Sequence, residues 1–94
     1  MTKEPFIFQL FVTGDEQHSK RAAANLKQIC ETYLENNYHI EIIDILTCFD
    51  CAIENDIFLS PALVKVSPAP RTVIFGNLND TAKTVASLQL DKSS

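Results

Sequence analysis

The pattern of apolar and polar positions changes period several times along the chain, and each period predicts an element. Over residues 6–12, apolar side chains fill both faces of an extended segment. One face carries Phe6, Phe8, Leu10 and Val12, and the other carries Ile7 and Phe11. A strand that is apolar on both faces belongs inside a sheet that is covered on both sides. The first predicted element is therefore a buried strand.

Helical spacing follows over residues 19–35, which predicts a helix with one buried stripe. The stripe consists of Ala22, Leu26, Ile29, Cys30, Tyr33 and Leu34. Asp15 or Ser19 is expected to cap the start of this helix. Asn36 and Asn37 are expected to end it, because asparagine tolerates the left-handed conformation.

The middle of the chain is predicted in the same way to form a strand over 39–46, a short helix over 52–58 and strands over 62–66 and 72–75. A last helix is expected to contain Val85, Leu88 and Leu90 and to be capped by Asn79 or Asp80. The order βαβαββα predicts an α/β fold, a thioredoxin-like three-layer sandwich. We expect one domain over residues 1–94. Pro61 stands where such folds place a cis-proline.

Composition and charge narrow the classes of function. The chain has 94 residues, of which 46% are hydrophobic and 21% charged, as in an ordinary globular domain. Its formal net charge of −4 argues against nucleic acid as a partner, because phosphate binding needs a basic surface. There is no apolar run of transmembrane length and no signal-peptide pattern, so we expect no membrane association and a cytoplasmic location.

The most suggestive chemical motif is Cys48-Phe49-Asp50-Cys51, a C-x-x-C pattern that is typical of redox sites. It follows the second predicted strand, whereas the active pair of thioredoxins follows the first. Asp44 and Asp50 would also disfavour a thiolate. In a reducing cytosol we expect all three cysteines to be thiols, with Cys30 in a helix core. A redox role for Cys48 and Cys51 stays open as an alternative.

No other motif predicts catalysis or a bound cofactor. His18 and His39 lack the spacing of metal ligands, and two glycines cannot form a phosphate-binding loop of the G-x-x-x-x-G-K type. Scattered serine, histidine and aspartate residues do not make a catalytic triad. We therefore expect no metal, no cofactor and no enzymatic activity.

Longer stretches of the sequence resemble the KaiB family, and the resemblance runs from about residue 6 to residue 90. It rests on LFVTG at 10–14, IDIL at 43–46, the ungapped block IFLSPALVKV at 57–66, PAP at 68–70 and IFGNL at 74–78. The block over 57–66 is the most specific part.

The resemblance implies a non-enzymatic regulator that adopts two folds. One is a tetrameric ground state of order βαββααβ, and the other is a thioredoxin-like monomer. They differ in the last third of the chain. The implied partners are the N-terminal ring of a KaiC-type ATPase, further copies of the chain in a dimer or tetramer, and, in clocks, KaiA and a competing histidine kinase. A homo-oligomer that has lost KaiC binding stays open as a further alternative.

The resemblance gives two sets of candidate residues, one from matched positions and one from the last third of the chain, where the two folds differ. The partner-binding set is Arg21, Ala52, Ile57, Phe58, Lys65 and Arg71. The fold-switch set is Pro61, Pro68, Pro70, Gly76, Ser87 and Gln89.

Departures from the family pattern affect both sets. Asp56 replaces a usual lysine, and Thr72 and Val73 replace paired arginines, which predicts retuned KaiC binding and a role in stress adaptation or output signalling. Ser87 and Gln89 replace glycine and aspartate and are expected to favour a helix.

Overall fold

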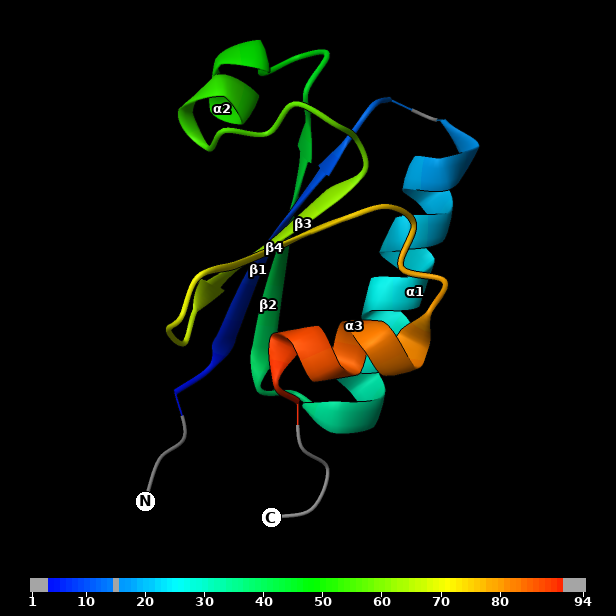
Figure 1. The fold of residues 1–94 in the computed structure, drawn as a ribbon, viewed down its shortest axis with the longest axis vertical. Helices are drawn as coiled ribbons and strands as arrows, with labels where there is room; N and C mark the ends of the chain where they lie inside the picture. Colours follow the sequence, from blue (N-terminus) through cyan, green and yellow to red (C-terminus); the bar gives the residue numbers. More distant parts are fainter. Residues whose placement is uncertain (1–3, 15, 91–94) are drawn as a thin grey trace.

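The computed structural model describes residues 4–14 and 16–90, and it has the predicted βαβαββα order (Figure 1). The elements are β1 (Phe6–Val12), α1 (Gln17–Tyr33), β2 (Tyr38–Asp44), α2 (Phe49–Glu54), β3 (Ala62–Ser67), β4 (Thr72–Phe75) and α3 (Thr81–Leu88). Asp15, one of the two predicted caps of the first helix, lies outside the described residues.

The four strands form one mixed sheet in the order β2-β1-β3-β4. β1 runs parallel to β2 and antiparallel to β3, and β3 is antiparallel to β4. The register places Leu10 opposite Ile42 on one side and opposite Leu63 on the other. Phe8 and Leu10 of central β1 belong to the core on one face and Phe11 to the core on the other, so β1 contributes apolar side chains to both faces of the sheet, as its sequence predicts.

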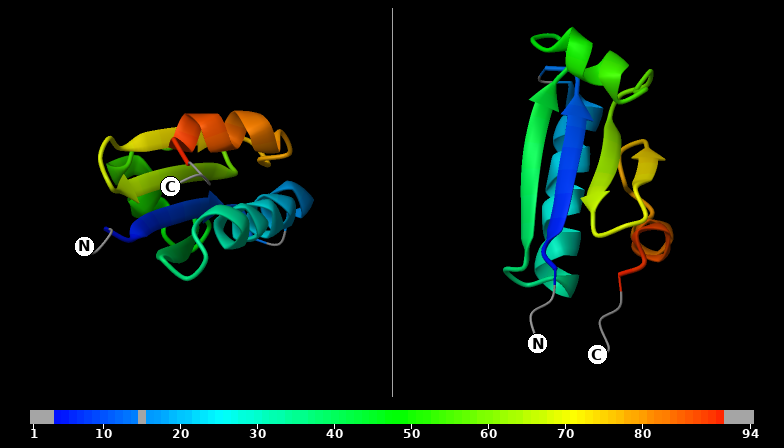
Figure 2. Two further views of the ribbon diagram at one scale, coloured as in Figure 1. Left: turned by 90° about the horizontal axis from the view of Figure 1, so that it is seen from below. Right: turned by 90° about the vertical axis from the view of Figure 1, so that its left-hand side faces the viewer.

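Two hydrophobic cores of unequal size lie on the two faces. The larger core packs α1 and α3 against the sheet through side chains such as Phe8, Leu26 and Leu88. The smaller core consists of Phe11, Ala52, Ile57, Ala62 and Val64, and it attaches α2 to the other face. Figure 2 shows α1 behind β1 and β2, and α2 beyond one end of the strands.

The first helix starts and ends earlier than predicted. Glu16 stands at its N-cap without a side-chain hydrogen bond. The Ser19 hydroxyl instead accepts a hydrogen bond from the Thr13 N–H at 3.0 Å, which holds the loop before the helix. At the other end Glu35, rather than an asparagine, takes the left-handed conformation, with φ 53°.

The second helix also differs from its predicted range, since it spans Phe49–Glu54 rather than 52–58. Asp56 is left-handed, with φ 60°, and this conformation ends the helix. The Ile57 N–H then donates to the Ala52 carbonyl at 2.8 Å and the Asp56 N–H donates to the Ile53 carbonyl at 3.1 Å. This pair of bonds is the Schellman motif, and it brings Ile57 into the same core as Ala52.

The last helix corrects one expectation from the sequence. Gln89 is not helical: it is the left-handed residue that closes α3, with φ 59°. The Leu90 N–H donates to the Val85 carbonyl at 3.1 Å, which completes a second Schellman motif. Helix propensity therefore explains a benefit of Ser87, which is inside the helix, but none of Gln89.

Gln89→Gly is expected to raise the free energy of unfolding by about 0.5–1 kcal/mol, because glycine adopts the left-handed conformation without a Cβ penalty. Ser87→Gly is the matched control, two residues away inside α3, and it should lower the free energy of unfolding by about 0.5 kcal/mol. Urea denaturation of both variants checks the signs. A loss of stability in Gln89→Gly would contradict this account of the helix end.

Candidate functional site

The carboxyl ends of parallel β1 and β2 meet at one end of the sheet, and α2 lies beyond them (Figure 1). We call residues 45–61, which run from the end of β2 through α2 to the start of β3, the α2 end. In open α/β sheets, binding sites form at the carboxyl ends of strands. The α2 end is therefore the place to look for a functional surface.

The Asp44 carboxylate organises the entry to this surface. Its Oδ1 accepts hydrogen bonds from the Gly14 N–H at 3.1 Å and the Leu46 N–H at 2.9 Å. Gly14 has φ 52°, and a Cβ built on it would lie 3.3 Å from the Leu46 side chain. The loop after β1 and the loop after β2 are thus joined at one half-buried carboxylate. The sequence favoured solvent exposure of this strand-end aspartate over a buried, functional one.

Asp44→Ala is expected to lower the free energy of unfolding by about 1–2 kcal/mol, because two backbone N–H groups lose their acceptor. Asp44→Asn keeps an oxygen in the same place and should recover most of that loss. Asp50→Ala, at an exposed position in α2, is the control and should change stability by no more than about 0.5 kcal/mol. Thermal and urea denaturation measure all three. Equal losses for Asp44→Ala and Asp50→Ala would contradict the linking role.

Large apolar side chains are exposed all along the α2 end. Phe58 is 77% exposed, Leu46 69%, Phe49 67%, Leu59 65% and Ile53 49%. Large apolar side chains that are exposed together in one segment, rather than scattered singly, are typical of a binding surface. Ala52 is the one buried residue of α2, so most of this short helix faces solvent.

The predicted partner-binding residues divide into two groups. Phe58 is exposed in the α2 end, and Arg71 and Arg21 are exposed as well. The Arg71 guanidinium donates to the Asn55 carbonyl at the end of α2, at 3.1 Å, so it lies beside the exposed apolar side chains. Arg21 lies in the first half of α1, which begins at the same end of the molecule (Figure 1).

The other three residues of that set do not fit direct contact. Ala52 is 3% exposed, Ile57 4% and Lys65 2%. Ala52 and Ile57 hold α2 on the sheet. Lys65 points to the face covered by the helices, and its Nζ lies 5.7 Å from the centre of the Phe6 ring, a cation–π distance. A lysine in a strand suggests a solvent-facing charge, but here Lys65 shares the face of Leu63, which α1 and α3 cover.

The cysteines also differ from expectation. Cys48 and Cys51 form a disulfide, with Cα atoms 5.4 Å apart, so the prediction of three free thiols is wrong for this pair. Cys30 is a free thiol and fully buried in the larger core, as predicted. Burial, followed by the charge of Glu31, raises the pKa of the Cys30 thiol to about 12.

The predicted fold-switch residues flank β3 and β4 and continue into α3. The peptide bonds before Pro61, Pro68 and Pro70 are all cis. The Gly76 N–H donates to the Pro61 carbonyl at 2.9 Å, and Gly76 itself has φ 110°. Ser87 is exposed on α3.

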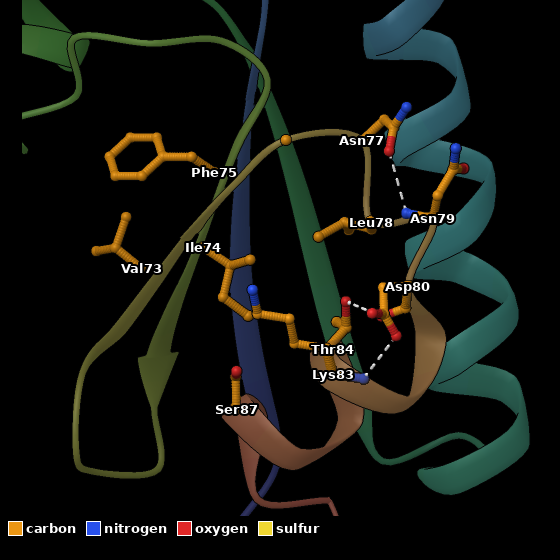
Figure 3. Close-up of a pocket in the computed structure, with 11 residues that line it drawn as sticks. Val73, Ile74, Phe75, Asn77, Leu78, Asn79, Asp80, Lys83, Thr84 and Ser87 are labelled. Carbon is orange, nitrogen blue, oxygen red and sulfur yellow. Dashed lines mark hydrogen bonds between the residues drawn. The ribbon is translucent and has the colours of Figure 1, made fainter.

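Gly76 and Ser87 both line a hollow of about 490 Å³ between β4, the following loop and α3 (Figure 3). Several of its polar groups are hydrogen-bonded within the protein. Asp80 Oδ1 accepts from the Lys83 N–H at 3.0 Å, and the Asn77 side chain accepts from the Asn79 N–H at 3.1 Å. We therefore interpret the hollow as the inner side of a capped helix start and not as a ligand site.

One structural residue was missed by the sequence analysis. The Asn25 amide donates to the Asn77 carbonyl at 2.8 Å and to Asn79 Oδ1 at 3.0 Å, and so ties α1 to the loop before α3. A single polar residue within a helix gives no signal of a contact with a loop more than 50 positions away.

Within residues 4–14 and 16–90, no three histidine, cysteine, aspartate or glutamate side chains gather as a metal ion would require. No helix in the same part of the chain combines the length and the apolar character that crossing a membrane demands.

Comparison with known proteins gives a consistent picture. Residues 9–90 match the KaiB domain family. The circadian clock protein KaiB3 of Synechocystis sp. is 33% identical over 90 residues, which cover 96% of this chain and 88% of that protein. The circadian clock oscillator protein KaiB of a Picosynechococcus strain is 36% identical over 90 residues, covering 96% and 86%.

Solved structures agree on the fold. The N-terminal domain of Synechococcus elongatus SasA aligns with a TM-score of 0.76 at 20% identity, covering all of this chain and 92% of that domain. Mitochondrial thioredoxin 3 of Saccharomyces cerevisiae aligns with a TM-score of 0.72 at 18% identity, covering 94% and 81%. These likenesses show a thioredoxin-like fold. Together with the matched family domain and its clock-protein relatives, they lead to one conclusion: the chain belongs to the KaiB family.

Proposed function

We propose that this chain is a KaiB-type regulatory protein that binds a KaiC-type ATPase ring through its α2 end and catalyses no reaction of its own. One observation carries the proposal: the α2 end of a KaiB-family chain exposes five large apolar side chains around a helix that is otherwise barely anchored. A few buried side chains supply most of the energy of a protein interface, and phenylalanine is among the residue types enriched there.

Charge supports the same surface. Arg71 is held beside α2 by the Asn55 carbonyl, and Arg21 belongs to the first half of α1, which begins at the same end of the molecule (Figure 1). Arginine is enriched at protein interfaces, and it steers an acidic partner as well as contacting it. Asp50, Glu54 and Asp56 are exposed there too, so the surface carries both signs. Asp56 replaces the family's usual lysine, which favours a retuned interaction in stress adaptation or output signalling over the standard oscillator.

The test is co-elution of the full chain with the KaiC-type ATPase of the same organism, with ATP present, over hours. Phe58→Ala is expected to weaken binding more than tenfold, because it removes an aromatic side chain of the proposed contact surface. Val66→Ala, an apolar residue 46% exposed on β3 outside the α2 end, is the control and should bind as the unchanged chain does.

Two charge-reversal variants test the contribution of arginine to the surface. Arg21→Glu is expected to weaken binding, whereas Lys27→Glu, also exposed on α1 but further from the α2 end, should not. No complex at high micromolar concentrations of both proteins would overturn the proposal. Equal effects of Phe58→Ala and Val66→Ala would overturn the assignment of the surface but not of the partner.

A second candidate is self-association, which the same exposed apolar side chains favour, together with Phe75 at 48% exposure. A dimer or tetramer would bury this surface, and its stability would then depend on protein concentration. Sedimentation over a hundredfold dilution distinguishes the cases, because a monomer at every concentration excludes this candidate.

A further inference from the structure

The disulfide of the α2 end lies at the edge of the smaller core, where Cys51 packs against it but is not enclosed by it. Cys48 immediately precedes α2 and Cys51 lies in its first turn, where the Cys51 N–H donates to the Cys48 carbonyl at 3.1 Å. Both cysteines are only half-buried, and Phe49 between them is 67% exposed. Cys30 is the opposite case, since it is fully buried and unbridged. The three sulfur atoms thus fall into an accessible pair and an inaccessible single thiol.

We propose that Cys48 and Cys51 are a reversible dithiol–disulfide site that exchanges with a dithiol of another protein. Exposed apolar side chains next to the pair offer such a protein a contact surface. Leu46 precedes Cys48, Phe49 lies between the two cysteines in sequence, and Ile53 follows Cys51 by about half a helical turn. Asp50 and Glu54 are exposed on the same helix, so the surface is complementary to a reductant with neutral or basic residues around its dithiol.

The exchange balances in two steps. A thiolate of the incoming dithiol attacks one sulfur of the Cys48–Cys51 bond, a mixed disulfide forms, and the displaced cysteine sulfur leaves with the electron pair and takes a proton. The second thiol of the reductant then attacks the mixed disulfide and releases the other cysteine. Overall, two electrons and two protons pass to Cys48 and Cys51, and the reductant ends as its own disulfide.

The surrounding charge sets the direction of the chemistry. C-x-x-C sites that act as oxidants do so because their reduced thiolate form is stabilised. Here Asp50, which is exposed, falls between the two cysteines in sequence, and a nearby like charge disfavours a thiolate. The site therefore favours the bridged form and is opened by a strongly reducing dithiol; it does not insert disulfides into other proteins.

The state of the bridge also matters for α2 itself. The helix has six residues, its N-cap makes no side-chain hydrogen bond, and only Ala52 anchors it by burial. A helix this short is not stable on its own. The covalent link between Cys48 and Cys51 closes its first turn, so opening the link is expected to loosen that turn and move Phe49.

The experiment counts thiols in the full, folded chain. The protein is equilibrated in mixtures of reduced and oxidised dithiothreitol, quenched with acid, labelled with a maleimide while denatured, and weighed by mass spectrometry. We expect three labels per chain after reduction and one after oxidation, reversibly, with the helical circular dichroism largely retained. The Cys30→Ala variant should carry two labels after reduction and none after oxidation. The double variant Cys48→Ser, Cys51→Ser should show one label in every mixture.

A second variant separates exchange in the native state from exchange through unfolding. Ile29→Val, in the larger core, should raise the unfolded population about 2- to 12-fold. Native exchange predicts an unchanged rate of reduction in Ile29→Val, together with faster amide hydrogen exchange over residues 48–54 in the reduced chain. A rate of reduction that rises with the unfolded population overturns the proposal and makes the bridge a structural link. Three labels in oxidised dithiothreitol overturn it as well, because no bridge then forms.

Discussion

Phe8→Ala is expected to lower the free energy of unfolding by about 3–5 kcal/mol, because it leaves a cavity at the centre of the larger core. The Phe8 side chain is fully buried, and its ring stacks on that of Phe6 with centroids 5.9 Å apart. Domains of this size are commonly stable by only 5–15 kcal/mol, so the loss would be a large share of the total. Urea denaturation followed by circular dichroism measures it.

Phe58→Ala is the matched control, because it removes the same ring from a position 77% exposed. Its free energy of unfolding should change by no more than about 0.5 kcal/mol, although its binding to a partner should suffer. The pair of variants thus separates a phenylalanine that holds the fold from one that is free to bind. Similar losses of stability in both would show that Phe58 packs into the protein in solution.

Stability is expected to fall as the pH rises from about 9 to about 12, because of Cys30. Burial and the neighbouring Glu31 charge raise the pKa of this thiol from 9.0 to about 12. Above pH 9 the unfolded chain releases the proton while the folded chain keeps it, so deprotonation favours unfolding. The contribution is complete below pH 9 and is lost by ~1.4 kcal/mol per pH unit above it.

Cys30→Ala isolates this effect from other groups that titrate in alkali. The variant should be less stable at pH 7, because a buried side chain is shortened, yet its stability should fall less steeply between pH 9 and pH 10.5. Guanidinium denaturation at several pH values gives the two slopes. Parallel slopes would mean that the thiol ionises equally easily in the folded and unfolded chains.

Much of the fold could be predicted from local patterns, because the spacing of apolar residues differs between helices and strands. Alternation of apolar residues identified β1, and the exact range of β4 followed from four residues between a proline-rich turn and Gly76. The capping role of Asp80 was also predictable, because its side chain accepts from the Lys83 N–H three positions on. These features depend on neighbours in sequence.

What escaped prediction depends on contacts between distant segments. Lys65 looks like a surface charge until its own face of β3 is known to be covered by α1 and α3. Gln89 was expected to favour the helix, but in the structure it takes the left-handed conformation directly after Leu88 and closes α3. Asp44 reads as an exposed strand end until Gly14, thirty residues earlier, donates to it.

The two unequal cores have a consequence for how the molecule opens. Among residues 4–14 and 16–90, the smaller core that holds α2 has five buried side chains, whereas the core of α1, α3 and the sheet has eleven. Regions with few buried contacts open locally at a lower free energy than the whole fold does. Amide protons over residues 49–57 should therefore exchange through a local opening that leaves β1 and α1 protected. The part of the chain that meets partners would then also be the part that samples other conformations most often, without the rest of the domain unfolding.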